Sequence, residues 1–441
     1  MPIPRPRIAV EPAGPGEPRP RTGVDLGAAY AGSDAQLAES LREAAIRLNG
    51  REPAERIVVA VPDSWLDGGV DGARRREVVR RALADELGLP LLAVIGRSQA
   101  LVASQASLED GADGDPPYTV TACHLDDDAL AFGRCEVTAA AAGPAIVLTG
   151  CQAGQAPPLS ASFGAVMATA LRTRLADDPA PADIGADAAD SMAGLFAELG
   201  ARRERLRAAL SAGASNAVFF TVPVLGLPGT PPAQWVTAGE IKAGFDPLAA
   251  ALTSAVRTFR SEVGPSACGR LVLTGPAAAN PLAVELVRAE FAGRADAAGS
   301  VPVTVADVLA PARGAARVAR GTATAELPAT AAYRLPVHRI AAGRLAGGLV
   351  DLPTSCYLRP AGTATVLVPE GSSSPARLGD TAVPAGSYRV GLWPGLTGAV
   401  LALLPAGGAP AILVALPTGE IAVTTPSLEA ASAPPADSGR N

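Results

Sequence analysis

The chain has 441 residues, of which 48% are hydrophobic and 18% are charged, and its formal net charge is −6 at pH 7. This length and composition are typical of a globular protein with two or three domains, and the acidic balance argues against a general nucleic-acid or anionic-membrane surface. The longest apolar stretches, such as 398–404 and 411–416, are too short to cross a bilayer as helices, so no membrane insertion is expected.

Cysteine and histidine usage argues against several kinds of site. Five cysteines include no CxxC pair, and the two histidines are His124 and His338. A structural zinc site, a disulfide framework and a histidine-dependent catalytic triad are therefore not expected. The N-terminus lacks the apolar segment of a signal peptide, and together these features predict a protein of the reducing cytoplasm.

Up to about residue 330, strand-like and helix-like segments alternate. Residues 1–22 are rich in proline and arginine, with one short strand at 7–10. Apolar residues at helical spacing predict a helix over 34–48, and the run RIVVAV at 56–61 predicts a buried strand. Further strands are predicted at 91–95, 118–126, 130–137, 217–222 and 270–274, and further helices at 74–87, 99–105, 161–175, 191–210, 247–262 and 281–291. This alternation is typical of an α/β fold.

The composition changes after about residue 335. Short runs of Val, Leu and Thr, separated by turns rich in Gly and Pro, occupy residues 335–426. They predict a small all-β domain, followed by a disordered tail over 427–441. The predicted organisation is thus an N-terminal segment over 1–22, a central domain over 23–330, and this β domain with its tail.

Several segments, taken in order, resemble the nucleotide-binding domain of the Hsp70 chaperones over about residues 30–325. Residues 59–89, which begin VAVPDSW, are similar to the strand ending in "TVPA" and the helix after it. Residues 204–211, ERLRAALS, are similar to "ERAKxxLS", and residues 306–319, ADVLAPARGAARVA, are similar to the closing helix of the domain. The resemblance implies an actin-like (ribonuclease H-like) two-lobed α/β fold. It also implies two β-hairpin loops that hold phosphates through glycines, with an aspartate in each loop to organise a metal ion.

The second of these loops departs from the family. Where the family has "DLGGGTFD", residues 124–131 read HLDDDALA. His124 stands at the metal-organising aspartate, and Asp126, Asp127 and Asp128 replace three glycines. Carboxylates here would repel a phosphate, by roughly 4 kcal/mol for two unit charges at about 4 Å and an effective dielectric near 20. A bound Mg²⁺ or Ca²⁺ could offset this repulsion, but we favour the interpretation of a solvated acidic turn.

Other positions that the resemblance aligns are also changed. Arg97 stands where the family has the glutamate that orients the attacking water, and the adenosine loop "GGSxR" is GPAAA from Gly275 onward. Glu204 is kept and Arg207 can stand for the lysine of "ERAK". Lys242 is the only lysine and falls on a later element, so the catalytic lysine of the family is absent.

The first phosphate loop has two interpretations. Residues 23–32, GVDLGAAYAG, are similar to "GIDLGTT", which would make Asp25 the metal-organising aspartate and Gly27 the phosphate glycine. Alternatively, residues 7–16 are the remnant of the first strand and loop, with Glu11 in the place of the aspartate. The second interpretation is favoured, because the stretch between GVDLG and RIVVAV is several times shorter than in the family.

The resemblance and the losses together predict a pseudo-ATPase that acts as a protein-binding scaffold or chaperone-like adaptor, with no catalytic residue, no metal and no cofactor. One alternative is a divergent but active Hsp70-type ATPase that binds ATP or ADP with Mg²⁺. Another is a binding module in which the C-terminal β domain carries the interaction. A protein partner is expected, and the sequence leaves the oligomeric state open. The candidates for vestigial nucleotide binding are Asp25, Gly27, Asp126, Asp127, Asp128, Glu204, Arg207 and Gly275.

An arginine cluster follows residue 200. Arg202, Arg203, Arg205 and Arg207 lie within six positions of one predicted helix. We interpret them first as a solvated helix face and second as a surface for an acidic partner. The tryptophans at 65, 235 and 393 are predicted to be core or partly buried residues.

Overall fold

The computed structural model describes residues 6–11, 21–27, 32–49, 56–106, 117–126, 129–141, 143–155, 163–164, 167, 199–223, 233–263, 269–292, 301–328, 333–341, 344–352, 365–368, 376–378, 381–384, 386–405 and 409–416. The chain divides into two compact units that interleave in sequence. The first unit comprises 1–32, 46–64 and 95–325, and the second comprises 33–45, 65–94 and 326–441.

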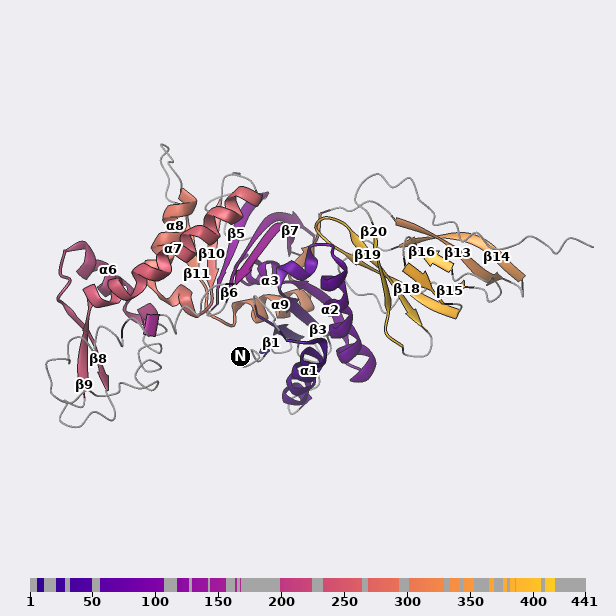
Figure 1. Ribbon diagram of the computed structural model, residues 1–441, viewed down its shortest axis with the longest axis horizontal. Coiled ribbons are helices and arrows are strands. Elements are labelled where there is room, and N and C mark those ends of the chain that lie inside the picture. The colour runs from indigo at the N-terminus through magenta and orange to yellow at the C-terminus, as the bar shows by residue number, and fades with distance from the viewer. Residues whose placement is uncertain are drawn as a thin grey trace, which may run out of the picture. The chain divides into compact units, whose positions relative to one another are not determined.

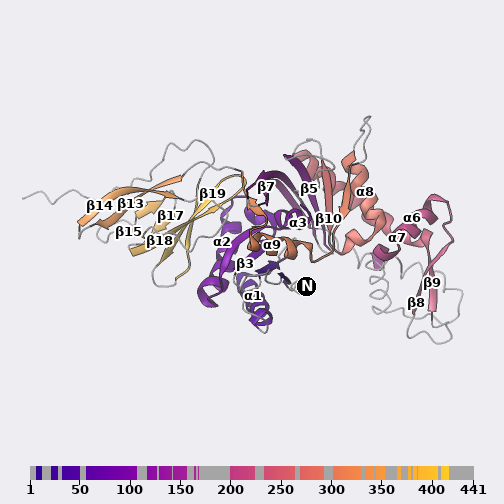
Figure 2. The ribbon, with the colours of Figure 1, turned by 180° about the vertical axis from the view of Figure 1, so that it is seen from behind.

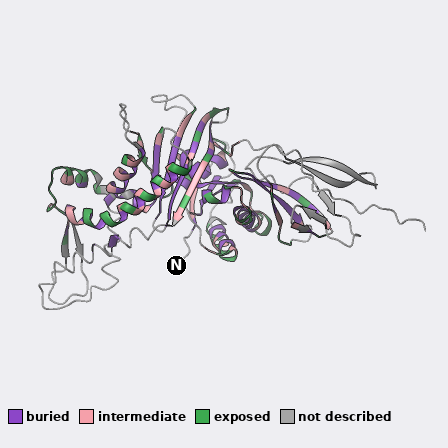
Figure 3. Cartoon of the chain, turned by 45° about the horizontal axis from the view of Figure 1, so that its top comes forward, coloured by how far each residue is buried: buried purple, intermediate pink, exposed green. Residues whose placement is uncertain are grey.

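A six-stranded mixed sheet forms the centre of the first unit (Figure 1). Strands β5 (Tyr118–Leu125), β6 (Ala129–Ala140) and β7 (Gly143–Gln155) are successive antiparallel neighbours. On the other side of β5, β10 (Arg270–Thr274) and β11 (Val303–Val305) continue the sheet in parallel, and β12 (Thr324–Glu326) lies beyond β7. Most residues of β5 and β10 are buried (Figure 3), and in β5 they include the polar residues Thr121 and His124.

The main core of this unit lies between the sheet and two helices, α7 (Ala238–Val263) and α8 (Pro281–Ala292). Phe132 on β6 packs against Phe259 of α7 with ring centroids 5.4 Å apart, and Phe259 meets Phe291 of α8 at 6.1 Å. The sequence predicted that the first of these helices begins at Pro247, a residue that favours helix starts. That start is wrong, because the helix begins nine residues earlier and contains Pro247.

A second sheet has the order β1-β2-β3-β4, formed by β1 (Arg7–Glu11), β2 (Arg21–Asp25), β3 (Arg56–Val61) and β4 (Leu91–Gly96). Strand β1 is antiparallel to β2, and β2 is parallel to β3.

Helix α9 (Ala310–Arg320) packs against β2 and against α3 (Arg97–Gln105), as can be followed from behind in Figure 2. Glycines allow the approach: a Cβ on Gly314 would lie 1.6 Å from the Ala100 carbonyl oxygen, and one on Gly23 would lie 1.9 Å from that of Ala312. This packing fixes the end of β2 relative to the start of α3.

The second unit contains most of α1 (Asp34–Asn49), α2 (Val70–Arg80), a π-helical turn over Arg81–Glu86 and the C-terminal strands. A separate antiparallel sheet has the order β15-β18-β19-β20, from β15 (Thr365–Val368), β18 (Gly386–Pro394), β19 (Ala399–Pro405) and β20 (Ile412–Leu416). Two antiparallel pairs accompany it: β13 (Tyr333–Ala341) with β14 (Arg344–Leu352), and β16 (Ala376–Leu378) with β17 (Thr381–Val383). The prediction of a mixed α/β fold with a separate antiparallel C-terminal sheet is confirmed.

Within the second unit, the turn between β18 and β19 is fastened to the segment before α2. The Leu396 amide donates to the Leu66 carbonyl at 2.7 Å, and the Thr397 amide donates to that of Asp67 at 3.0 Å. Arg76 of α2 is 1% exposed; its Nη1 donates to the Pro394 carbonyl at 2.7 Å, and its guanidinium lies 5.0 Å from the centre of the Trp393 ring. We call this set of contacts the Arg76 clamp.

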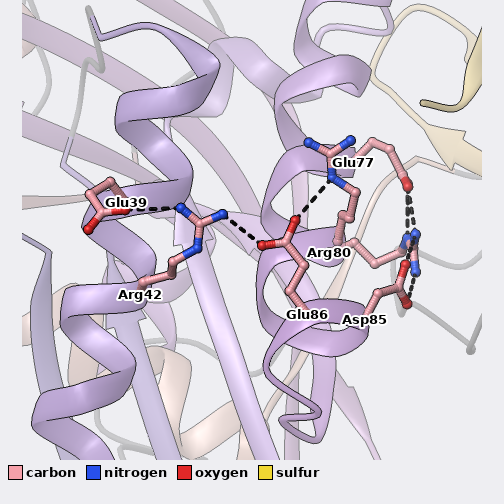
Figure 4. A network of polar contacts seen from close by, with 7 residues as sticks. Glu39, Arg42, Glu77, Arg80, Asp85 and Glu86 are labelled. Atoms are coloured by element: carbon pink, nitrogen blue, oxygen red, sulfur yellow. Dashed lines mark hydrogen bonds and ion pairs between the residues drawn. The ribbon is translucent and has the colours of Figure 1, made fainter. Parts of the chain in front are cut away.

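Charged side chains link α1 with α2 and the π-helical turn (Figure 4). Arg42 bonds to Glu39 and to Glu86, while the buried Arg80 is held between Glu77 and Asp85. A buried guanidinium needs such partners, because an unpaired charge inside a protein is strongly unfavourable.

Candidate functional site

The ends of three strands meet at the start of α3 in the first unit. Asp25 ends β2, Asp126 follows β5, and Gly275 follows β10, while Arg97 is the first residue of α3. Gly275 has φ 106°, and a Cβ there would lie 2.5 Å from the Leu125 carbonyl oxygen. Only glycine therefore allows the end of β10 to come this close to the turn after β5.

Arg97 is the centre of this group. Its Nη1 lies 2.5 Å from Asp126 Oδ2, its Nε lies 3.0 Å from Asp25 Oδ1, and the side chain is fully buried. The position is unusual, because the positive end of a helix dipole disfavours a cation at the first residue. Two carboxylates offset that cost. We call Arg97, Asp25 and Asp126 the Arg97 cluster.

Electrostatics keep the Arg97 cluster ionised. Burial lowers the pKa of Arg97, but the charges of Asp126 and Asp25 outweigh burial and leave the pKa above its ordinary value. Burial raises the pKa of Asp126, but Arg97 and then Arg7 outweigh it, so this pKa lies below the ordinary value. Arg7 Nη1 lies 3.4 Å from Asp25 Oδ2 and 3.9 Å from Asp126 Oδ1. The positive charges of Arg97 and Arg7 thus balance the negative charges of the two aspartates.

A second buried polar group adjoins the first. Ser98 Oγ donates to Asp63 Oδ2 at 2.5 Å, the Ser98 amide donates to Asp63 Oδ1 at 3.0 Å, and His124 Nε2 lies 3.1 Å from Ser98 Oγ. Because the hydroxyl proton is directed to Asp63, Nε2 of His124 is the donor to Ser98. Burial raises the pKa of Asp63 to about 6, against the lowering effect of its bonds from Ser98. Burial and then the charge of Arg97 hold the pKa of His124 well below its ordinary value.

This group is not built as a nucleophilic triad. In such a triad the imidazole lies between the carboxylate and the hydroxyl, whereas here the hydroxyl lies between the other two. Ser98 and His124 are also fully buried, so no substrate reaches the oxygen. The arrangement pairs the buried carboxylate of Asp63 with Ser98, and it leaves Nδ1 of His124 without a hydrogen-bond partner among the described residues.

The structure brings together four of the sequence-predicted site residues and leaves two apart. Asp25 and Asp126 contact Arg97, Gly275 lies beside Leu125 and Asp126, and Gly27 donates its amide to Asp25 Oδ1 at 3.0 Å. Glu204 and Arg207 pair with each other at 3.1 Å on the exposed face of α6 (Arg203–Ser211), and Arg207 also lies 4.0 Å from Glu285 of α8. Asp127 and Asp128 lie outside the described residues.

The two interpretations of the first loop place their acidic residues at opposite ends of one strand pair. In the β1–β2 register, Glu11 pairs with Arg21, while Asp25 pairs with Arg7 at the opposite end. Glu11 therefore lies at the far end of the strand pair from the Arg97 cluster. Asp25, within GVDLG, is the aspartate that reaches the site.

Sequence reasoning missed the partnership of Arg97 with two carboxylates, and it gave no role to Arg7, Asp63 or Ser98. One signal was present: Arg97 follows the apolar run 91–95 directly and precedes the apolar residues of a helix. A charge placed between two buried segments needs buried partners.

The residues of the Arg97 cluster do not fit a divalent cation. Both carboxylates are directed to the guanidinium, which would repel a metal ion held between them. Among the residues that the structure describes, no group of three or more potential metal ligands occurs.

No protein-family profile matches the chain, and no curated protein is detectably similar to it in sequence. Of the helices in the described ranges, none has both the length and the apolar character required to cross a bilayer.

Proposed function

We propose that this chain is an Hsp70-like pseudo-ATPase of the actin-like class and that it acts as a protein-binding scaffold or chaperone-like adaptor. The observation that carries the proposal is the buried Arg97 guanidinium between Asp25 and Asp126. In the resemblance, these two aspartates belong to the two loops that hold ATP and its metal ion. The Arg97 guanidinium therefore occupies the space between the two loops where an active ATPase would hold its bound ligand.

Energetics support the same proposal. A nucleotide phosphate or a metal ion entering between the two loops would have to displace Arg97 from its carboxylates. Breaking a buried ion pair by removing one partner costs about 3–5 kcal/mol, because the remaining charge is left uncompensated. Nucleotide binding would have to exceed this cost before any affinity appeared.

The alternative of a divergent, active ATPase receives less support. It would need Glu204 and Arg207 as nucleotide contacts, and these two side chains pair with each other at the surface of α6. The further alternative, in which the C-terminal β domain carries the binding, is tested by deleting residues 335–441 and measuring retention of a bound partner.

The decisive experiment is titration calorimetry of the full chain with ATP and with ADP in the presence of Mg²⁺, together with a phosphate-release assay. An active Hsp70 serves as the positive control. We expect neither heat of binding at millimolar nucleotide nor turnover. Turnover that depends on Mg²⁺ and is lost when Asp126, Asp127 and Asp128 are changed to alanine would overturn the proposal.

A further inference from the structure

Three buried polar side chains form an unbranched hydrogen-bonded chain in the first unit. Asp63 follows β3, Ser98 is the second residue of α3, and His124 lies on β5. Ser98 Oγ lies 2.5 Å from Asp63 Oδ2 and 3.1 Å from His124 Nε2, so the hydroxyl lies between a carboxyl group and an imidazole. Asp63 is 4% exposed, and the other two residues are fully buried. We call these three residues the Asp63 relay.

Packing holds the Ser98 hydroxyl in this position. A Cβ on Gly133 of β6 would lie 2.1 Å from Ser98 Oγ and 3.1 Å from Asp63 Oδ2, so the glycine backbone covers the hydroxyl closely. The Ser98 amide donates to Asp63 Oδ1 at 3.0 Å, which leaves Oδ2 as the oxygen that faces the hydroxyl. The hydroxyl proton therefore has two acceptors within reach, Asp63 Oδ2 and His124 Nε2.

The other ring nitrogen of His124 does not fix the tautomer. Nδ1 is buried and has no hydrogen-bond partner among the residues that the structure describes. In a neutral imidazole one nitrogen is a donor and the other is an acceptor, and the hydrogen bond made by one nitrogen sets the state of the other. The contact with Ser98 therefore decides whether the ring proton of His124 lies on Nε2 or on Nδ1.

Asp63 is the member of the relay that takes up a proton as pH falls. Burial raises its pKa to about 6, whereas burial and then the charge of Arg97 hold the pKa of His124 well below its ordinary value. The charged and titratable groups that act on the relay come from the elements around it: Arg97 of α3, Asp25 of β2, Asp126 after β5, Arg7 of β1 and Cys135 of β6. The shifted pKa values of Arg97 and Asp126 keep both ionised in this range, and burial raises the pKa of Cys135 and keeps its thiol protonated.

We propose that protonation of Asp63 reverses both hydrogen bonds of the relay and moves the ring proton of His124 from Nε2 to Nδ1. When Asp63 is ionised, Ser98 donates to Oδ2 and Nε2–H donates to Ser98 Oγ. When Oδ2 carries a proton, the carboxyl group donates to Ser98, and the hydroxyl turns to donate to Nε2. The net change is one proton taken up at Asp63, because the ring loses one proton at Nε2 and gains one at Nδ1.

The switch links pH to the start of α3. The negative charge that protonation removes lies beside the Ser98 amide at the helix N-terminus, where the helix dipole favours an anion. Arg97 is the neighbouring residue, so the change takes place next to the Arg97 cluster. The switch needs no ligand, and it does not depend on the pseudo-ATPase proposal.

The test follows the ring nitrogens of His124 by ¹⁵N NMR in the full chain, labelled with ¹⁵N-histidine, from about pH 8 to about pH 5. His338 is the other histidine, and His338→Gln assigns the signals of His124. The nitrogen that carries the proton is recognised by its chemical shift. We expect the protonated nitrogen to change from Nε2 to Nδ1, with a midpoint that coincides with the titration of the Asp63 carboxyl carbon, followed by ¹³C NMR.

Variants separate the relay from other causes of such a change. In Asp63→Asn the amide nitrogen donates to Ser98 at every pH, as the protonated carboxyl group does, so we expect the His124 proton on Nδ1 throughout. Ser98→Ala removes the link, so the tautomer should no longer follow the titration of Asp63. Asp246→Asn, at an exposed pair with Lys242, is the matched control and should leave the change and its midpoint unaltered.

Three outcomes overturn the inference. The first is a proton that stays on Nε2 over the whole range while Asp63 titrates, and the second is a tautomer change that persists in Asp63→Asn. The third is an imidazole protonated on both nitrogens near pH 6, which would make His124 the group that takes up the proton. The titration of the unsubstituted chain is decisive by itself, so the test holds even if Ser98→Ala does not fold. Its failure leaves the pseudo-ATPase proposal unchanged, because that proposal depends on the nucleotide assays.

Discussion

Arg97 and Asp126 form a buried ion pair, with Nη1 of the arginine 2.5 Å from Oδ2 of the aspartate. The two residues follow strands of different sheets: Arg97 follows β4 directly, and Asp126 follows β5. Asp25 joins them from the end of β2. A single side chain thus connects both predicted phosphate loops, and the connection requires no ligand.

Loss of the Arg97 guanidinium should destabilise the protein strongly. Arg97→Met keeps most of the side-chain volume but leaves two carboxylates facing each other in the interior, which costs about 3–5 kcal/mol. The urea midpoint, followed by circular dichroism, measures the loss. Arg257→Met is the matched control, because it breaks an exposed pair with Glu290 and is expected to change the midpoint little. Equal midpoints for the two variants would contradict a tightly paired Arg97.

Divalent cations should partly rescue a variant with a smaller side chain at this position. Arg97→Ala leaves Asp25 and Asp126 around an emptied space, and paired carboxylates suit Mg²⁺ or Ca²⁺. We expect about 10 mM of either cation to raise the melting temperature of Arg97→Ala and not to change the melting temperature of the unsubstituted chain. The double variant Arg97→Ala/Asp126→Asn should lose the response. A rise of the same size in the double variant would show that the cation binds elsewhere.

Asp63 should give the protein a specific pH dependence. Its pKa is raised from 3.8 to about 6, so between these values the folded state holds a proton that the unfolded state releases, and stability falls as pH rises. His124 acts in the opposite sense. Its pKa is lowered from 6.5, so the unfolded state binds a proton that the folded state does not, and stability is lost as pH falls below that value.

The variant Asp63→Asn removes the pH dependence caused by Asp63 and keeps that caused by His124. The difference in unfolding free energy between the unchanged chain and Asp63→Asn should therefore decrease by on the order of 3 kcal/mol from below pH 4 to above pH 6. Urea unfolding at a series of pH values measures it. A difference that is constant with pH would mean that the pKa of Asp63 is the same in the folded and unfolded states.

A methyl group added at Gly395 should disrupt the Arg76 clamp, whereas one added at Gly391 should not. A Cβ on Gly395 would lie 2.2 Å from Gly68 Cα, whereas one on Gly391 would have its nearest contact, the Ala402 Cβ, at 4.0 Å. Gly395→Ala should therefore expose α2 and the C-terminal strands to limited proteolysis, and Gly391→Ala should not. The same clamp means that deletion of 335–441 removes the Pro394 carbonyl and the Trp393 ring from Arg76, so the deletion needs a folding control before any loss of partner binding is interpreted.

Collisional quenching should identify Trp235 as the accessible indole. Trp65 and Trp393 are buried, so quenching reports mainly on Trp235, and Trp235→Phe should remove most of it. Arg205 bonds to the Val218 carbonyl in the strand that pairs with that of Trp235, and its positive charge attracts anions, so iodide should quench more efficiently than caesium at equal concentration. Equal quenching by the two ions would argue against a net positive charge near Trp235.

Local patterns allowed much of the fold to be predicted from the sequence. RIVVAV forms the buried strand β3, and the two segments around the acidic turn form β5 and β6 as a hairpin. These elements are determined by apolar runs and turns within a few residues. The helix predicted at 161–175 falls almost entirely outside the described residues, and so does the predicted tail over 427–441.

The site was harder to predict, because its partners are far apart in sequence. Asp25, Arg97 and Asp126 are brought together by β2, α3 and β5, and no local pattern encodes their contact. Loop length favours Glu11 over Asp25 for the first loop, whereas the register of β1 with β2 brings Asp25 to Arg97 and leaves Glu11 at the other end of the strand pair. The Hsp70-like identity and the loss of ATP hydrolysis stay predictions that the nucleotide assays address.

The Arg76 clamp has a consequence for how the protein is made. Arg76 and the carbonyl that caps it are separated by 318 residues. A ribosome adds about 5–20 residues per second, so α2 emerges on the order of tens of seconds before Pro394 does. During that interval the Arg76 guanidinium, which is buried in the folded protein, stays in contact with water, and the second unit cannot complete its folding. We therefore expect the nascent chain to depend on holding factors until its last strands leave the ribosome.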